Sequence, residues 1–162
     1  MKTFVLASVF LFVFVALGNG QENSLEGVWQ MYVPQGGNPV IENQETGELS
    51  IDFGKLKPTS FYKFFCKNGD FLALVTTPVV SKLTITGTYE VLSPDRYVEH
   101  VKEHSNPAYA NRDTELKYRF IGNDVFIMSY VNQLGGISME IWTKVKFDKP
   151  KDEPIQQGQK KI

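Results

Sequence analysis

Apolar and polar residues alternate along most of the chain with a period of two, which is typical of β-strands that have one buried face. No long segment shows the 3.6-residue period of an amphipathic helix. The pattern therefore predicts an all-β protein. The expected strands cover residues 27–33, 61–66, 70–75, 83–92, 97–102, 115–121, 125–131 and 137–147, with residues 49–53 as a shorter ninth candidate.

Glycine-containing turns separate several of these strands. Residues 68–69 are Asn-Gly, a pair that can adopt the positive φ angles of a tight hairpin turn. Residues 122–124 read Gly-Asn-Asp and residues 135–136 read Gly-Gly, and both lie between strands. We therefore expect each strand to run antiparallel to the next one along the chain.

About eight antiparallel strands leave unpaired edges unless the sheet closes on itself. Closure of such a meander gives an up-and-down barrel whose interior holds side chains or one small ligand. The predicted domain covers residues 21–147. Residues 34–48 and 106–111 are expected to be irregular, the first as a mobile loop or lid, and residues 148–162 a flexible tail rich in charge, glutamine and proline.

Residues 1–20 have the features of an export signal. Lys2 is followed by an almost continuous apolar run over residues 4–17, and Gly18 and Gly20 supply the small residues that a signal peptidase reads. We expect cleavage before Gln21, a secreted or periplasmic protein, and no stable membrane span afterwards. The alternative, an uncleaved anchor helix, is disfavoured because the run is shorter than the roughly 20 residues of a membrane span.

Charge and cysteine content exclude two further classes of protein. The 17 Lys and Arg residues are balanced by 18 Asp and Glu residues, so we expect no binding to nucleic acid. Cys66 is the single cysteine, so a disulfide within the chain is impossible and stability must come from packing. Because Cys66 follows two phenylalanines in a strand, we expect it to be a small core residue rather than a haem or metal ligand.

Candidates for catalysis or metal binding are few. His100 and His104 lie beside Glu99 and Glu103, but on a strand four residues span about 13 Å, too far for one metal ion. A solvated, charged strand edge explains these residues better than a metal site. No phosphate-binding loop or nucleophile motif is present. We therefore expect neither an enzyme nor a bound cofactor.

Aromatic residues are the stronger indication of function. Side chains of this kind can line a small-molecule cavity, with hydroxyl and carboxylate groups receiving a polar part of the ligand. The same residues can equally form a packed core, because small barrels are often filled by their own side chains. The cavity candidates are Trp29, Tyr62, Phe64, Tyr89, Glu99, Tyr118, Glu140 and Trp142.

The first strand opens with Gly27-Val28-Trp29. This Gly-x-Trp sequence resembles the opening motif of lipocalins, in which the tryptophan closes one end of the barrel under a basic residue of the last strand. The resemblance implies that Trp29 closes the barrel and that Lys144 is its basic partner. Lys144 stands where arginine is expected, and its ammonium stacks on an aromatic ring less well than a guanidinium does.

A closer resemblance covers nearly the whole mature chain. The chain is similar to a family of small secreted bacterial lipocalin-like proteins, with calycin-type barrels and no assigned function. This resemblance implies an extracellular or periplasmic barrel and leaves the ligand open. The Thr-Asp-Tyr loop and the disulfides of the well-known extracellular lipocalins are missing. The matching segments are residues 62–64, 87–89, 97–99, 116–118 and 140–142.

Two hypotheses follow from the sequence. The first is non-catalytic binding of a small apolar ligand inside the barrel. The second is a solid barrel that serves as a protein-interaction or scaffolding module of the cell envelope. A hollow barrel mouth favours the first, whereas a filled interior with an exposed apolar patch of more than a few hundred Å² favours the second.

Overall fold

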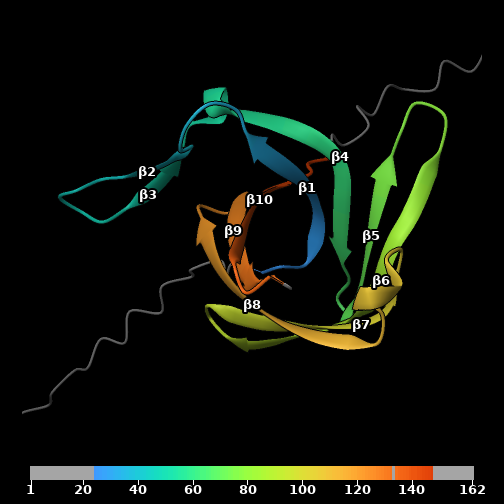
Figure 1. Ribbon diagram of the computed structural model, residues 1–162. Coiled ribbons are helices and arrows are strands. Elements are labelled where there is room, and N and C mark those ends of the chain that lie inside the picture. Colours follow the sequence, from blue (N-terminus) through green and yellow to red (C-terminus); the bar gives the residue numbers. More distant parts are fainter. Residues whose placement is uncertain (1–23, 133, 148–162) are drawn as a thin grey trace, which may run out of the picture.

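The computed structural model describes residues 24–132 and 134–147. The predicted signal segment with its cleavage site, and the predicted tail, lie outside these residues. Within them, eight antiparallel strands form a closed barrel in the order β1-β10-β9-β8-β7-β6-β5-β4 (Figure 1). The prediction of an all-β, up-and-down barrel of about eight strands is confirmed. The barrel strands are β1 (Gly27–Pro34), β4 (Leu56–Phe65), β5 (Asp70–Thr76), β6 (Ser81–Ser93), β7 (Arg96–His104), β8 (Arg112–Ile121), β9 (Val125–Val131) and β10 (Ile137–Lys144).

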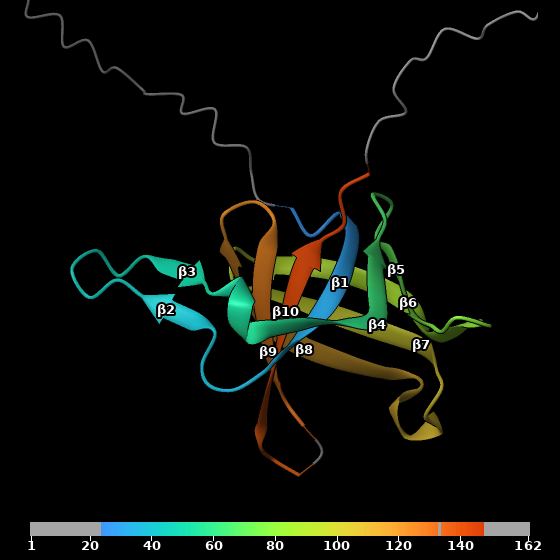
Figure 2. The same ribbon diagram turned by 90° about the horizontal axis from the view of Figure 1, so that it is seen from above.

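Barrel strands that are paired in space also follow one another along the chain, with one exception. The exception is the pair of the first and last strands, β1 and β10, which closes the barrel. β1 pairs with β4 on one side and with β10 on the other, with Trp29 opposite Lys63 and Lys144. Closure in this way leaves no barrel strand with a free edge. Figure 2 shows both ends of the described chain at one end of the barrel, and the turn between β9 and β10 at the opposite end.

The predicted hairpin turns are present, and each contains a glycine with a positive φ. Gly69 has a φ of 87° and Gly135 a φ of 77°, values in the left-handed region that a residue with a Cβ rarely adopts. Between β4 and β5 the amide of Cys66 donates to the carbonyl oxygen of Asp70 at 2.8 Å. Glycine at these positions therefore fixes where each strand reverses.

Residues 34–48 differ from the irregular loop that the sequence predicts. Val40–Glu42 forms strand β2, which pairs antiparallel with β3 (Leu49–Ile51) in a separate two-stranded sheet. The hairpin forms because β-branched Val40 and Ile41 meet a matching apolar strand across a turn that Asn43 caps. The ninth predicted strand thus exists, but it lies outside the barrel (Figure 1).

A small apolar cluster anchors this hairpin to the outside of the barrel. Leu56, Val125 and Ile141 are buried there, and Ile51 of β3 packs against them. Phe53, in the short 3₁₀ helix η1 (Phe53–Lys55), meets the ring of Tyr32 edge-on at 6.5 Å. The arm therefore covers the part of the outer surface around Leu56, Val125 and Ile141.

The main core lies inside the barrel. Because side chains alternate along a strand, every second residue of β4 points inward, namely Phe61, Lys63 and Phe65. Cys66 follows with the opposite parity and is exposed, so the prediction that it belongs to the core is wrong. Leu83 on β6 is also exposed, and a bulge near Ala73 shifts the pairing of β5 with β6 beside it.

Gly87 is required by a close approach between β6 and its neighbours. A Cβ at this position would clash with the carbonyl oxygen of His100 and lie 2.9 Å from Cε1 of Phe71. We expect Gly87→Ala to lower the free energy of unfolding by about 1–3 kcal/mol, the usual cost of overpacking. Thr88→Ala, on the exposed face of the same strand, is the control in chemical denaturation. Equal stability of the two variants would contradict this packing.

Candidate ligand cavity

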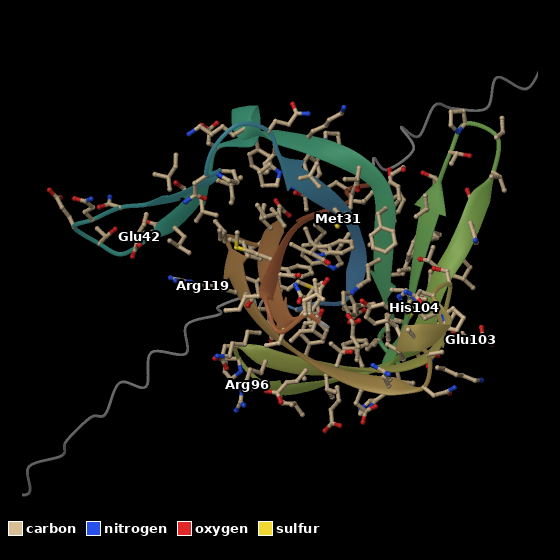
Figure 3. The ribbon with its side chains drawn as sticks, in the orientation of Figure 1. Met31, Glu42, Arg96, Glu103, His104 and Arg119 are labelled. Atoms are coloured by element: carbon tan, nitrogen blue, oxygen red, sulfur yellow. The ribbon has the colours of Figure 1, made fainter. Side chains whose placement is uncertain are left out.

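A cavity of about 590 Å³ occupies the end of the barrel opposite Trp29. Figure 3 shows Met31 inside the ring of strands, whereas Arg96 and Arg119 lie on its outer surface. The volume falls within the range of about 300–1,000 Å³ that small-molecule sites occupy. The apolar part of the wall consists of Phe61, Ile85, Val101, Leu116, Met128 and Tyr130. Polar groups inside the cavity come from Lys63, Glu99 and Glu140.

A buried ion pair crosses the cavity floor. The ammonium of Lys63 on β4 lies 2.7 Å from Oε1 of Glu99 on β7, and both side chains are almost fully buried. The hydroxyl of Tyr97 donates to the same oxygen at 3.0 Å. Buried charges are tolerated when they are paired and hydrogen-bonded, and Glu99 meets both conditions.

The Lys63 ammonium is also surrounded by aromatic rings. It lies 5.3 Å from the centre of the Trp142 ring, 5.7 Å from that of Phe71 and 5.8 Å from that of Phe65. A cation over aromatic faces is attracted by the ring quadrupoles, and this attraction grows when water is excluded. The inside of the barrel therefore stabilises a positive charge with one carboxylate and three rings.

Glu140 on β10 forms a second carboxylate site. Its Oε1 accepts a hydrogen bond from the Tyr130 hydroxyl at 3.1 Å, and its Oε2 accepts one from the Trp142 indole at 3.1 Å. Among the described residues, no lysine or arginine nitrogen lies within ion-pair distance of Glu140. Two neutral donors therefore orient this carboxylate without neutralising it.

The tyrosines that hold these carboxylates remain protonated over a wide pH range. Burial, followed by the nearby charge of Glu140 and the hydrogen bond to it, raises the pKa of Tyr130 to about 12. Burial also raises the pKa of Tyr97 well above its ordinary value, and Glu99 adds to the effect. Both hydroxyls are therefore hydrogen-bond donors at neutral and mildly alkaline pH.

The cavity mouth carries charges of both signs. The ring of His104 packs at a tilt against that of Tyr109 in the 3₁₀ helix η2 (Pro107–Tyr109), with the ring centres 5.0 Å apart. Nδ1 of His104 accepts a hydrogen bond from the backbone amide of Asn106. Arg112 and Asp113 begin β8 at the rim and are exposed. Rim charges in water interact weakly, so the deeper groups determine the electrostatic character of the cavity.

The two histidines do not come together as a metal site. Nδ1 of His100 lies 2.8 Å from Asp113 on the neighbouring strand, while His104 faces the cavity mouth. Within residues 24–132 and 134–147, no group of three or more histidine, cysteine, aspartate or glutamate side chains is placed to hold a metal ion.

Trp29 lies at the other end of the barrel and is fully buried. Its indole donates to the carbonyl oxygen of Leu25 at 2.6 Å, and its ring meets Phe126 edge-on at 4.7 Å. The ammonium of Lys144 lies 5.2 Å from the centre of the Trp29 ring. This end of the barrel is therefore packed by side chains.

The other predicted cavity residues fall into three groups. Glu99 and Glu140 line the cavity. Trp142 and Tyr89 pack in the aromatic core below it, and Tyr118, also buried, reaches the carbonyl oxygen of Ser93. Tyr62 and Phe64 do not belong to the cavity, because the parity of β4 turns Lys63 and Phe65 inward in their place.

Sequence reasoning missed Lys63, Phe61 and Tyr130. Lys63 looks like a solvent-facing residue between aromatic neighbours, and only its distant partner Glu99 shows that it points inward. Tyr130 has the parity of Phe126 and Met128, which are both buried on β9. Consistent use of that alternation would have identified Tyr130.

An open groove of about 1,200 Å³ lies outside the barrel. It runs between the β2–β3 arm and the outer face of β8 and β9, and the turn after β6 forms one end. Lys117 and Arg119 line it together with Ile127 and Met139. Because it is shallow and open, the groove encloses a small molecule less completely than the barrel cavity does.

Comparison with known protein families gives a match over residues 24–153, to the domain of unknown function DUF4488. The match includes the whole described barrel. The chain belongs to the DUF4488 family. No curated protein matches it.

No helix within the described residues has the length and apolar character needed to cross a membrane.

Proposed function

We propose that this protein is an exported, lipocalin-like carrier that binds a small, mostly apolar molecule inside the barrel without catalysing a reaction. The observation that carries the proposal is the cavity of about 590 Å³, which is open at one end and combines apolar walls with polar and charged side chains. A ligand that leaves water for such a site gains about 25 cal/mol for each Å² of apolar surface buried.

The structure of the barrel supports binding in two ways. Aromatic packing around Trp29 closes one end, so a ligand enters only from the mouth near His104 and Asn132. The cavity carboxylates are held by donors of the protein itself, which fits a preorganised binding site. The alternative, a solid barrel acting as a protein-interaction module, is less well supported because a cavity remains.

Export of the protein is part of the same proposal. The apolar run over residues 4–17 and the small residues Gly18 and Gly20 support a secreted or periplasmic location.

A neutral apolar dye tests the proposed binding directly. We expect N-phenyl-1-naphthylamine to bind with a Kd below about 100 μM, with increased fluorescence. Thr114→Trp places a large ring in the cavity lining and should weaken dye binding by at least about tenfold, because it removes the space that the dye needs.

Thr88→Trp is the matched control, because Thr88 lies on the exposed face of β6. Dye affinity should be unchanged in this variant. Equal dye binding in both tryptophan variants, or none in the wild-type protein, would overturn the proposal.

A further inference from the structure

Two carboxylate sites inside the barrel are built in a similar way. Glu99 accepts hydrogen bonds from the Tyr97 hydroxyl and from the Lys63 ammonium, and this ammonium also lies over the ring of Trp142. Glu140 lies beside Tyr130 and the same Trp142 ring. Within the described chain, only the first site has a cation of the protein within ion-pair distance.

Glu140 also lies among aromatic residues, but Trp142 and Tyr130 turn their N–H and O–H donors toward it rather than their ring faces. The ring of Phe61 lies 5.8 Å from the ring of Trp142, and Phe61 and Tyr130 both line the cavity. A desolvated cation gains both from ring faces and from an ionised carboxylate, whereas an anion at the same place is repelled by the carboxylate. This environment therefore discriminates by the sign of the ligand charge.

The basic side chains that line the cavity do not remove this preference for a cationic over an anionic ligand. The Lys63 ammonium is held by Glu99 at 2.7 Å. His104 uses Nδ1 to accept a backbone hydrogen bond, and Arg112 is exposed at the rim. The carboxylates of Glu99 and Glu140 outnumber the single ammonium among the deep polar groups of the described cavity.

We propose that the ligand of this cavity is an amphipathic amine, whose ammonium group binds the Glu140 carboxylate beside Tyr130 and Phe61 while its apolar body fills the barrel mouth. This inference rests on the proposed function and specifies the chemical class of ligand. The amine takes at Glu140 the place that Lys63 takes at Glu99.

Three probes with the same chain and different head groups test the inference. Decylamine, decanol and decanoic acid each compete with N-phenyl-1-naphthylamine at pH 7 and low salt. In the wild-type protein we expect decylamine to bind at least about tenfold more tightly than decanol, and decanoic acid most weakly. This ranking requires no variant, so it does not depend on any substitution being tolerated.

Glu140→Gln then tests the assigned residue. The amide keeps the shape of the side chain and removes its charge, so the advantage of decylamine over decanol should fall to about threefold or less. Glu90→Gln changes an exposed carboxylate of β6 and should leave the tenfold advantage intact. Thermal denaturation of both variants establishes that each is folded.

The outcomes separate this inference from the proposed function. If the dye binds and Thr114→Trp blocks it, but the three head groups compete equally or decanoic acid competes best, the cavity binds apolar molecules and the amine inference is overturned. The same holds if Glu140→Gln keeps the full preference for decylamine. If neither the dye nor any of the three probes binds, both the proposed function and the inference fail.

Discussion

Trp29→Ala is expected to lower the free energy of unfolding by about 3–5 kcal/mol, the usual cost of truncating a large buried aromatic side chain. The substitution removes a fully buried ring, its contact with Phe126 and its hydrogen bond to Leu25. It also exposes the ammonium of Lys144 to an empty space. Urea denaturation followed by circular dichroism measures the loss.

Phe147→Ala is the control for this prediction. Phe147 is 76% exposed, so its truncation should change stability by less than about 0.5 kcal/mol. A loss below about 1 kcal/mol in Trp29→Ala would mean that the tryptophan is not an essential part of the closed end.

Lys63→Met is expected to destabilise the protein by a similar amount, about 3–5 kcal/mol, for an electrostatic reason. Methionine fills much of the volume of lysine, but it leaves the carboxylate of Glu99 buried with the Tyr97 hydroxyl as its remaining partner. An unpaired buried charge is costly, whereas the pair itself contributes little net stability. Chemical denaturation of the variant measures the cost.

A double variant distinguishes charge from packing. Lys63→Met combined with Glu99→Gln removes both charges, so it should be more stable than Lys63→Met alone. Lys117→Met, at an exposed lysine of β8, should be neutral within about 0.5 kcal/mol. Simple addition of the two single losses in the double variant would show that packing, not the unpaired charge, causes the destabilisation.

The strands of the barrel could be predicted from the sequence because two local signals agreed. The period-two alternation locates the strands, and glycines with positive φ, such as Gly69 and Gly135, locate the turns between them. Both signals depend on near neighbours in the chain, so they need no knowledge of the partner strand. In the arm, β3 was predicted as the shorter ninth strand, whereas β2 was missed because its three residues are too few to show a period.

The direction of the side chains on β4 could not be predicted in the same way. Phe61, Tyr62, Phe64 and Phe65 make both faces of the strand aromatic, so alternation does not distinguish inside from outside. The choice is made by the ion pair between Lys63 and Glu99, which are 36 residues apart. A register that placed Tyr62 inward would leave Glu99 without its cation.

The inward direction of Lys63 on β4 accounts for several differences between the predicted and the observed cavity residues. It places Tyr62 and Phe64 outside the cavity, brings Lys63 into it, and exposes Cys66 at the end of the strand. Glu99 and Glu140, which the sequence analysis proposed as partners for a polar group of the ligand, both line the cavity. The contrast between them, one paired and one free of any protein cation among the described residues, appears only in three dimensions.

Pairing of β1 with β10 also determines when the molecule can fold. The first barrel strand is synthesised early, but one of its edges stays open until Ile137–Lys144 has left the ribosome, because Trp29 pairs with Lys144. Before that point both β1 and β9 are edge strands, which readily pair with other chains. Addition of the final eight-residue strand, β10, therefore converts an open sheet that is prone to aggregation into a closed barrel. If the protein is exported unfolded, this closing step would be postponed until the whole chain has crossed the membrane.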